Sequence, residues 1–335
     1  MAKVARHHHT VPRFYLERFA RDGRVGTVEL PGEKRFVQRI GDAATRNNFY
    51  TLDTVKAEDA DLFERELSKL EAKAASVFRE VLDKGTWPLC EEARRSVAEF
   101  AAVQYLRGPD QRRLMEQIIA LTTKLELSLA GKASIFDHAK ERLGREITEE
   151  EADLLWADVI RESGPPIELS ARGHIEQLLR VVPDVFRYLI CRPWVLTRFS
   201  RRRLFTSDTP LALLRRPDDQ SGVAPALATA WGLALPLSRE VGLLMADSLP
   251  IAEHTAFEVI VAGRFDTEGP PSTRLAALFN GVTMRNARRW LFHHPDDHAL
   301  IGTSLPTARD VEIGMSSVDF VAMGESFRTQ LRRDR

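Results

Sequence analysis

Three consecutive histidines near the start of the chain, His7 to His9, are the first residues whose side chains could do chemistry. An imidazole titrates near neutral pH and is a common metal ligand, so it can act as an acid, a base or a metal-binding group. The histidines run through Pro12 into an apolar, aromatic segment, Phe14 to Phe19. Because terminal segments are ordered only where something ties them down, we predict a strand or extended arm packed into the body and buried from Pro12 onward.

Two carboxylates lie beside the apolar stripe of a helix that the spacing of hydrophobic residues predicts over residues 60–82. Glu64 and Glu71 are seven residues apart and therefore lie along the same edge of that stripe. A carboxylate there must be hydrated, hydrogen-bonded or paired, because an isolated buried charge is costly. The simplest expectation is that both reach solvent and pair with Arg65 or Lys69. The alternative is that Glu71 belongs to a polar site.

The next predicted helix, residues 90–107, carries Gln104 and Arg107 on the same face as Val97 and Phe100. An inward-facing arginine needs a carboxylate, a carbonyl or an anionic ligand, because the guanidinium keeps its charge. Two interpretations stay open for Arg107: an internal ion pair with a glutamate that holds two helices together, or a contact with a ligand.

Asp208 lies at the end of a predicted strand, in Thr206-Ser207-Asp208-Thr209-Pro210. Side chains at strand ends can converge on a crevice while the backbone stays fixed. The same residues are typical of a turn in which the Asp side chain bonds the backbone two residues on, and the spacing alone favours this turn. Ser207 is not expected to be a nucleophile, because no Gly-x-Ser-x-Gly elbow surrounds it.

Several common site motifs are absent from the sequence. It contains no phosphate-cradling Gly-x-x-x-x-Gly-Lys-Ser/Thr, no Gly-x-Gly-x-x-Gly, no His-Glu-x-x-His and no Cys-x-x-Cys. A second group of histidines, His293, His294 and His298, is expected in a solvent-exposed loop. The arginine clusters, among them Arg288 and Arg289, are expected on solvated faces, where a local patch could still bind phosphate.

The pattern of elements predicts an α+β fold, a mainly helical N-terminal part packed against a C-terminal mixed β-sheet. Thr148 and Glu151 fit a helix capping box, and residues 31–46 are expected to form a polar loop. The predicted helices cover residues 60–82, 90–107, 110–130, 135–144, 148–163, 171–190 and 272–288. The predicted strands cover residues 24–30, 195–199, 203–206, 233–237, 242–246, 257–262 and 290–292.

Length and composition are those of an ordinary globular protein with one large domain or two smaller ones. Because no stretch near residue 190 resembles a linker, we predict a single domain over residues 1–335. In that domain a helical part, about 53–192, and a β-containing part, about 193–335, share one core with an N-terminal arm, 1–52. Lysine plus arginine and aspartate plus glutamate are 48 each, so no overall field favours nucleic acid or a membrane. With only two cysteines and no apolar stretch long enough to span a bilayer, we expect a cytoplasmic protein.

Six segments, in order and spacing, resemble the signature blocks of the domain-of-unknown-function 4238 family, from about residue 7 to 292. They are His9 to Leu16, Asn47 to Thr51, Phe63 to Glu71, Phe100 to Pro109, Thr206 to Pro210 and Pro236 to Ser238. The family usually has Arg-Thr-Pro where this chain has Arg107-Gly108-Pro109, which leaves Arg107 in place. The resemblance implies a bacterial or fungal protein without an assigned activity. It also implies that the candidate residues of these blocks belong together.

Two classes of function remain from the sequence. The first is a hydrolase with a His/Glu/Asp polar pocket that binds a divalent metal, since His, Asp and Glu are its usual ligands. The second is a non-enzymatic binding or defence-associated module that recognises a small molecule, a nucleic acid or a protein partner, because polar residues spread over six blocks suit a structural network equally well. The candidate residues are His9, Glu71 and Asp208 for catalysis, Asn48, Tyr50, Gln104 and Arg107 for substrate binding, and His9 and Asp208 for the metal.

Overall fold

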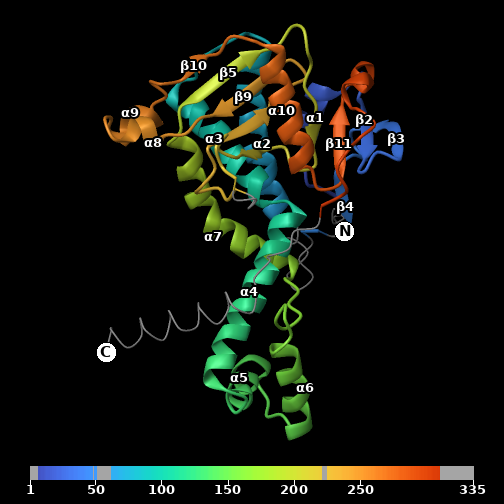
Figure 1. Cartoon of the computed structure of the whole chain (residues 1–335), viewed down its shortest axis with the longest axis vertical. Coiled ribbons are helices and arrows are strands. Elements are labelled where there is room, and N and C mark those ends of the chain that lie inside the picture. The colour runs from blue at the N-terminus through green and yellow to red at the C-terminus, as the bar shows by residue number, and fades with distance from the viewer. Residues whose placement is uncertain (1–6, 48, 51–61, 221–224, 310–335) are drawn as a thin grey trace. The chain divides into compact units, whose positions relative to one another are not determined.

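The computed structural model describes residues 7–47, 49–50, 62–220 and 225–309. It confirms the α+β class (Figure 1). The described residues form two compact units: unit 1 comprises those within 7–109 and 171–309, and unit 2 comprises those within 110–170. That all 335 residues act as one domain stays a prediction.

The centre of unit 1 is a five-stranded sheet covered by helices on both faces (Figure 1). Along β8, Leu233 and Leu235 pack toward helices α2, α3 and α7, whereas Ala234 packs toward α10. This alternation is what a strand buried on both faces requires. The strand order is β10 (Thr267–Glu268), β5 (Trp194–Arg198), β9 (Val241–Met245), β8 (Gly232–Pro236) and β7 (Ala212–Leu214). The helices are α2 (Leu62–Leu82), α3 (Glu91–Leu106), α7 (Ala171–Ile190) and α10 (Thr273–Asn286).

A buried ion pair ties α3 to this sheet. Arg94 donates from Nε to Asp266 at 2.7 Å, and both side chains are fully buried. Arg94 also donates to the carbonyls of Ile190 and Arg192 and lies over the Trp194 ring, 4.3 Å from its centroid. Its guanidinium therefore fixes the relative positions of α3, the end of α7 and the start of β5.

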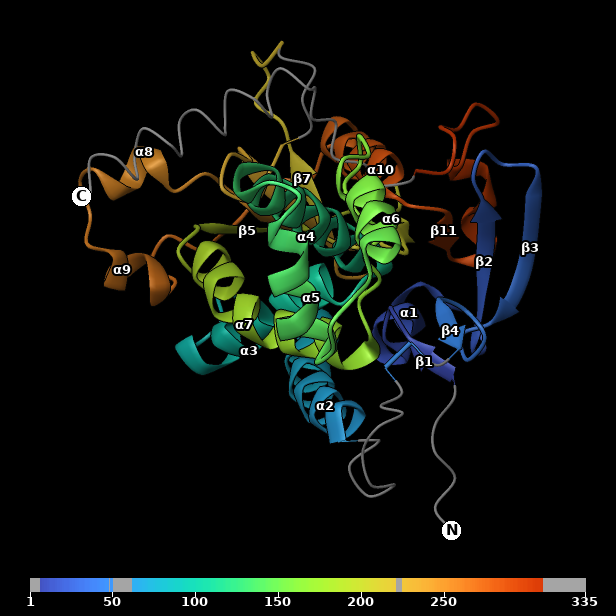
Figure 2. The ribbon, with the colours of Figure 1, turned by 90° about the horizontal axis from the view of Figure 1, so that it is seen from below.

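A second, four-stranded sheet joins the two ends of unit 1 and corrects one prediction. Its order is β3 (Lys34–Arg39), β2 (Arg24–Glu29), β11 (Trp290–His293) and β6 (Thr206–Ser207), with β3 outermost beside β2 (Figure 2). The polar loop predicted over residues 31–46 was wrong, because β3 and the short strand β4 (Thr45–Asn47) lie within it. Most β3 side chains are exposed, so the strand lacks the apolar face that would have marked it in the sequence.

The N-terminal arm is only partly a strand. His7–His9 form β1 and pair antiparallel with β4, but the chain then turns into helix α1 (Arg13–Leu16) and a 3-10 turn, η1 (Glu17–Phe19). Helical geometry places Tyr15, Leu16 and Phe19 on one buried face. The predicted burial of this segment is confirmed, whereas its predicted extended form beyond His9 was wrong.

The strand predicted over residues 257–262 was also wrong. Phe257–Val261 form helix α9, which follows the short helix α8 (Leu249–Ala252). Only Ile260 of this run is fully buried, while Phe257 and Val259 are exposed. A short apolar run does not distinguish a strand from a helical turn, and here one buried residue per turn suits the helix.

Unit 2 is helical in its described residues. It contains α4 (Pro109–Ala130) from its second residue onward, α5 (Ser134–Leu143) and α6 (Glu149–Val159). The predicted capping box at α6 is confirmed: the Thr148 side chain accepts from the Glu151 N–H, and the Glu151 carboxylate accepts from the Thr148 N–H.

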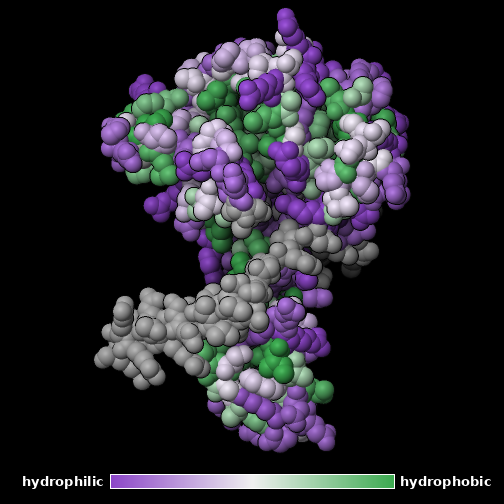
Figure 3. Space-filling view, viewed as in Figure 1, coloured by the Kyte–Doolittle hydropathy of each residue, from purple (hydrophilic) through white to green (hydrophobic). Residues whose placement is uncertain are grey.

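Hydrophobic and hydrophilic residues are interspersed over the surface seen in the space-filling view (Figure 3). None of the helices in the described part of the chain combines the length and the apolar character that crossing a bilayer requires.

Candidate functional site

Helix α3 holds the backbone of the N-terminal arm in place. Gln104 donates from Nε2 to the carbonyl of Thr10 at 2.8 Å. Arg107, 2% exposed, donates to the carbonyl of His9 and from Nη1 to Glu71 at 2.6 Å. The inward orientation predicted for Arg107 is confirmed. The pairing of Glu71 with charges on its own helix was wrong, because Glu71 reaches across to α3.

We call the contacts of Gln104, Arg107 and Glu71 with the arm the clamp. Next to it lies a buried group of aromatic and imidazole rings around Tyr50. The Tyr50 N–H donates to Nδ1 of His8 at 3.0 Å, and its hydroxyl donates to the Arg107 carbonyl at 2.7 Å. Burial raises the pKa of Tyr50 to about 12, so it stays protonated at neutral pH. Because Nδ1 of His8 accepts a hydrogen bond, a neutral His8 carries its proton on Nε2, 4.0 Å from Glu64. The N–H of this tautomer is therefore on the ring nitrogen nearer to Glu64.

His9 is a weak base in this setting. Its Nε2 accepts from Nε of Arg13 at 2.9 Å. Burial, together with the charges of Arg13 and Arg107, lowers the pKa of His9 to about 4, against smaller opposing effects of the Ala43 backbone and Asp42. The imidazole is neutral at pH 7, and its accepting nitrogen is already engaged.

The depressed pKa of His9 predicts a pH dependence. Between about pH 4 and the ordinary value of 6.5, the unfolded chain binds more protons at His9 than the folded chain does. The stability that His9 contributes is therefore complete above pH 6.5 and falls as the pH decreases through this window. An NMR titration of the ring, assigned with His9→Asn, should show no protonation above about pH 5. A midpoint near 6.5 would contradict the placement of His9 between two guanidiniums.

The clamped arm forms one wall of a cavity of about 150 Å³ in unit 1. Thr10 and Pro109, which lie next to the clamp residues, line part of the cavity. The rest of the lining comes from β3, from the turn that leads into β4, and from the residues at the ends of β6 and β11. The lining residues are Thr10, Phe36, Gln38, Asp42, Ala44, Thr45, Arg46, Pro109, Asp208, Thr209, Arg288, Arg289, Trp290 and Phe292.

Asp208 belongs to the part of the cavity lining that lies at the ends of β6 and β11. Its Oδ1 accepts from the N–H of Arg288 at 2.9 Å, and its Oδ2 accepts from the N–H groups of Arg289 at 2.9 Å and Trp290 at 3.2 Å. The local turn predicted for Asp208 was wrong: Ser207 makes that bond instead, accepting from the Thr209 N–H. Three backbone donors compensate the Asp208 charge and fix the direction in which the side chains at 288–290 leave the backbone.

The charged side chains that line the rest of the cavity are Arg46, Arg288, Arg289 and Asp42. Arg289 is paired with Glu29, and the Arg46 guanidinium lies over the Phe49 ring, 5.9 Å from its centroid. Asp42 was missed from the sequence, because nothing in its neighbourhood distinguishes it from any other loop carboxylate. Phe36 was missed as well, because Lys34-Arg35-Phe36-Val37-Gln38 shows no alternation of apolar and polar residues that would mark a strand.

A model of the family described as protein of unknown function (DUF4238) matches residues 7–297, most of the chain. The chain belongs to the DUF4238 family. Neither the curated proteins nor the solved structures with which it was compared contain a significant match.

In this DUF4238 chain, most of the residues singled out from the sequence take part in one arrangement. Hydrogen bonds join His9, Tyr50, Glu71 and Arg107 to one another, Gln104 holds the neighbouring Thr10, and Asp208 lines the same cavity as Thr10. His9, Glu71 and Arg107 support the cavity wall without lining it. Asn48 lies outside the described residues.

The two metal ligands predicted for the DUF4238 chain, His9 and Asp208, do not present free donors to a shared ion. The accepting nitrogen of His9 faces a guanidinium, and both Asp208 oxygens accept backbone N–H groups. Within the described residues, no three His, Cys, Asp or Glu side chains are grouped as a metal site. Metal binding by His9 and Asp208 stays a prediction, and no chemical step is derived from it.

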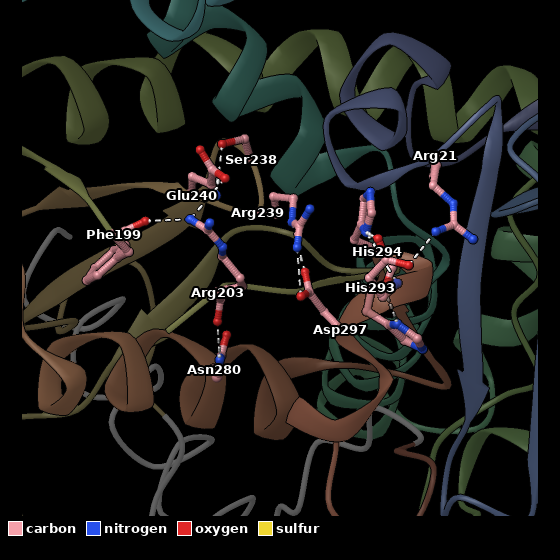
Figure 4. A network of polar contacts seen from close by, with 11 residues as sticks. Arg21, Phe199, Arg203, Ser238, Arg239, Glu240, Asn280, His293, His294 and Asp297 are labelled. Atoms are coloured by element: carbon pink, nitrogen blue, oxygen red, sulfur yellow. Dashed lines mark hydrogen bonds and ion pairs between the residues drawn. The ribbon is translucent and has the colours of Figure 1, made fainter. Parts of the chain in front are cut away.

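A second polar region of the DUF4238 chain lies beside β9 and β11 (Figure 4). It borders a cleft of about 630 Å³ lined by four arginines, each of which makes an ion pair. His293 and His294 are buried here, so their predicted exposure was wrong; His298 is exposed. His293 bonds the His294 carbonyl through Nδ1, and Nδ1 of His294 accepts from the Asp296 N–H. The polar side chains drawn in Figure 4 are hydrogen-bonded or ion-paired with one another. This favours a structural role for the region.

Proposed function

We propose that this DUF4238 protein is a binding protein whose cavity in unit 1 takes a phosphate-bearing ligand. The observation that carries the proposal is the placement of Arg46 and Arg288 on one small cavity in which the Asp208 charge is compensated by three N–H groups. A guanidinium matches the oxygens of a phosphate in geometry as well as in charge. A rigid, braced wall also reduces the ordering that binding requires.

Binding is better supported than hydrolysis. A general base works best with a pKa near the working pH, and the pKa of His9 is far below it. The Asp208 oxygens are directed at backbone donors, and Glu71 is directed at Arg107. The hydrolase expectation stays a prediction, and Asp42 is the cavity carboxylate on which such a reaction would depend.

Isothermal titration calorimetry of the full chain with inorganic pyrophosphate tests the proposal. We expect binding that weakens as salt is added, because the attraction is electrostatic. Arg288→Ala should lower the affinity about tenfold or more, since a hydrogen bond to a charged group contributes about 1.5–3 kcal/mol. Arg46→Ala should act in the same direction.

Arg285→Ala is the matched control. Arg285 precedes Arg288 by three residues, is exposed, and is not part of the cavity lining. Its replacement should leave pyrophosphate affinity unchanged. Absence of binding, or equal affinities in the Arg285 and Arg288 variants, would contradict the proposal.

A further inference from the structure

Strand β3 forms an open edge of the four-stranded sheet. Among the described residues, β2 is its only strand neighbour, and the register covers all six residues of β3 (Figure 2). The Ile40 N–H donates to the Gly23 carbonyl at 3.0 Å, which fixes the phase of the ladder. Because hydrogen-bonded and non-hydrogen-bonded positions alternate in an antiparallel pair, the even-numbered residues of β3 bond β2. The N–H and C=O groups of Arg35, Val37 and Arg39 are therefore directed away from β2.

Most of the outward backbone groups of β3 are available to a partner. In the part of the chain that the structure describes, nothing bonds the outward N–H and C=O groups of Arg35 and Val37, whereas the Arg39 carbonyl accepts from N–H groups of the following turn. Arg35 and Val37 are exposed, Val37 to 50%. A row of such groups along an exposed strand is a template to which another strand can pair.

Two arginines at one end of this hairpin lack a partner for their charge among the described residues. The register places Arg39 directly opposite Arg24, so both side chains lie on one face of the sheet. Both are exposed, and neither guanidinium makes a hydrogen bond or an ion pair with a described residue. Like charges directly opposite each other on neighbouring strands are destabilising. This end of the hairpin therefore favours the addition of an anionic group.

The charge of β3 restricts the kind of strand that can pair with it. The strand contains three basic residues and no acidic one. Lys34 is paired with Glu29, and Arg35 donates to backbone carbonyls, so Arg39 remains to pair with an added carboxylate. Two copies of β3 in their fullest overlap, centred on Val37, would place Arg35 of one copy against Arg39 of the other, which like charges disfavour. An extended segment with acidic side chains has the complementary charge.

We infer that β3 binds an extended acidic segment of a partner protein, which adds to the sheet as a fifth strand. Backbone hydrogen bonds to Arg35, Val37 and Arg39 supply affinity, and the side chains that alternate along the added strand supply selectivity. A carboxylate faces Arg39 and Arg24, and an apolar side chain packs beside Val37. The inference does not depend on the proposed phosphate site, because Arg35, Val37 and Arg39 are not part of the cavity lining.

The synthetic peptide Thr-Glu-Thr-Val-Thr-Glu-Thr tests the inference with the full chain. One face of this peptide is acidic, apolar and acidic in turn, because side chains of an extended strand alternate between its two faces. Fluorescence anisotropy of the labelled peptide should show saturable binding that weakens as salt is added. The matched peptide with lysine in place of both glutamates should bind at least about tenfold more weakly, because repulsive cross-strand pairs replace attractive ones.

Amide hydrogen exchange locates the bound peptide. Binding should slow exchange of the N–H groups of Arg35, Val37 and Arg39, which gain an acceptor. Exchange at Phe36 and Gln38 should change little, because their N–H groups already bond β2. NMR spectra of the full chain, recorded with and without the acidic peptide, measure this alternation.

Charge reversal at Arg39 tests the selectivity. Arg39→Glu should weaken binding of the acidic peptide about three- to tenfold, because a repulsive cross-strand pair replaces an attractive one. The same variant should bind the lysine peptide more tightly than the unaltered chain does. Arg285→Glu is the matched control, because it makes the same change in net charge at an exposed residue of α10. It should change neither affinity.

Val37→Pro tests the contribution of the backbone. Proline lacks the N–H, and it is tolerated in an edge strand where that group faces solvent. The variant should keep the circular dichroism spectrum of the unaltered chain and bind the acidic peptide at least about tenfold more weakly. If it does not fold, amide exchange of the unaltered chain tests the same contacts.

Absence of saturable binding overturns the inference, as does equal affinity for the acidic and the lysine peptides. Binding that leaves exchange of the outward amides unchanged also overturns it, because the peptide then lies elsewhere. A dimer in sedimentation velocity that Val37→Pro dissociates would assign the edge to a second copy of this chain and overturn the acidic partner. None of these results changes the expectation for pyrophosphate, so the proposed function is tested separately.

Discussion

Replacement of Arg94 by alanine is expected to lower the free energy of unfolding by about 3–5 kcal/mol, because removal of one partner of a buried ion pair leaves the other charge uncompensated. Asp266 has no access to water, and its other bond is to the Trp194 N–H. The carbonyls of Ile190 and Arg192 lose a donor at the same time. Urea-induced unfolding of unit 1, followed by far-UV circular dichroism and tryptophan fluorescence, measures the loss.

Arg95→Ala provides the control for this prediction. Arg95 is the next residue of α3, is half exposed, and faces Glu91 at 3.9 Å on its own helix. Exposed pairs of this kind contribute less than about 1 kcal/mol. Similar unfolding free energies for the two variants would show that the Arg94–Asp266 pair is not the buried connection described.

The second large effect is expected for Arg107→Ala, a loss of about 3 kcal/mol, near the lower end for buried pairs because Glu71 is 24% exposed and can be hydrated once unpaired. The His9 carbonyl also loses its donor, so the arm should loosen. Pyrophosphate binding should weaken too, because Thr10 and Pro109 form a wall of the cavity. Chemical unfolding and hydrogen exchange of the arm amides measure the two effects.

A double-mutant cycle separates the ion pair from the carbonyl bond. Glu71→Gln keeps an acceptor for Arg107 and should destabilise less than Arg107→Ala. If the double variant is as unstable as the sum of the single variants, Arg107 and Glu71 do not interact and the clamp is wrongly described.

The long helices could be predicted because each has an apolar stripe that the structure buries. The inward face of Gln104 and Arg107 followed from the same periodicity. Strand β3 could not be predicted so directly, because it lies at a sheet edge and needs little apolar surface. The helix α9 was missed because residues 257–262, five of which are apolar, have no clear period and fit either element equally well.

The hydrogen-bond and ion-pair partners of the site residues could not be predicted from local sequence patterns. Asp208 accepts from N–H groups about 80 residues away, and Arg107 reaches Glu71 on another helix. Such contacts depend on how sheets and helices pack, which spacing along the chain does not encode. The sequence therefore indicated which residues need partners, whereas the partners themselves come from the tertiary fold.

The pairing of β2 with β11 has a consequence for biosynthesis. Residues 26–29 meet residues 290–293, and residues 288–290 also supply the donors for Asp208. A ribosome adds roughly 5–20 residues per second, so one edge of the first hairpin waits on the order of ten seconds or more for its neighbour. The cavity is therefore completed late in translation, and a chain interrupted before residue 288 lacks the strand that closes it.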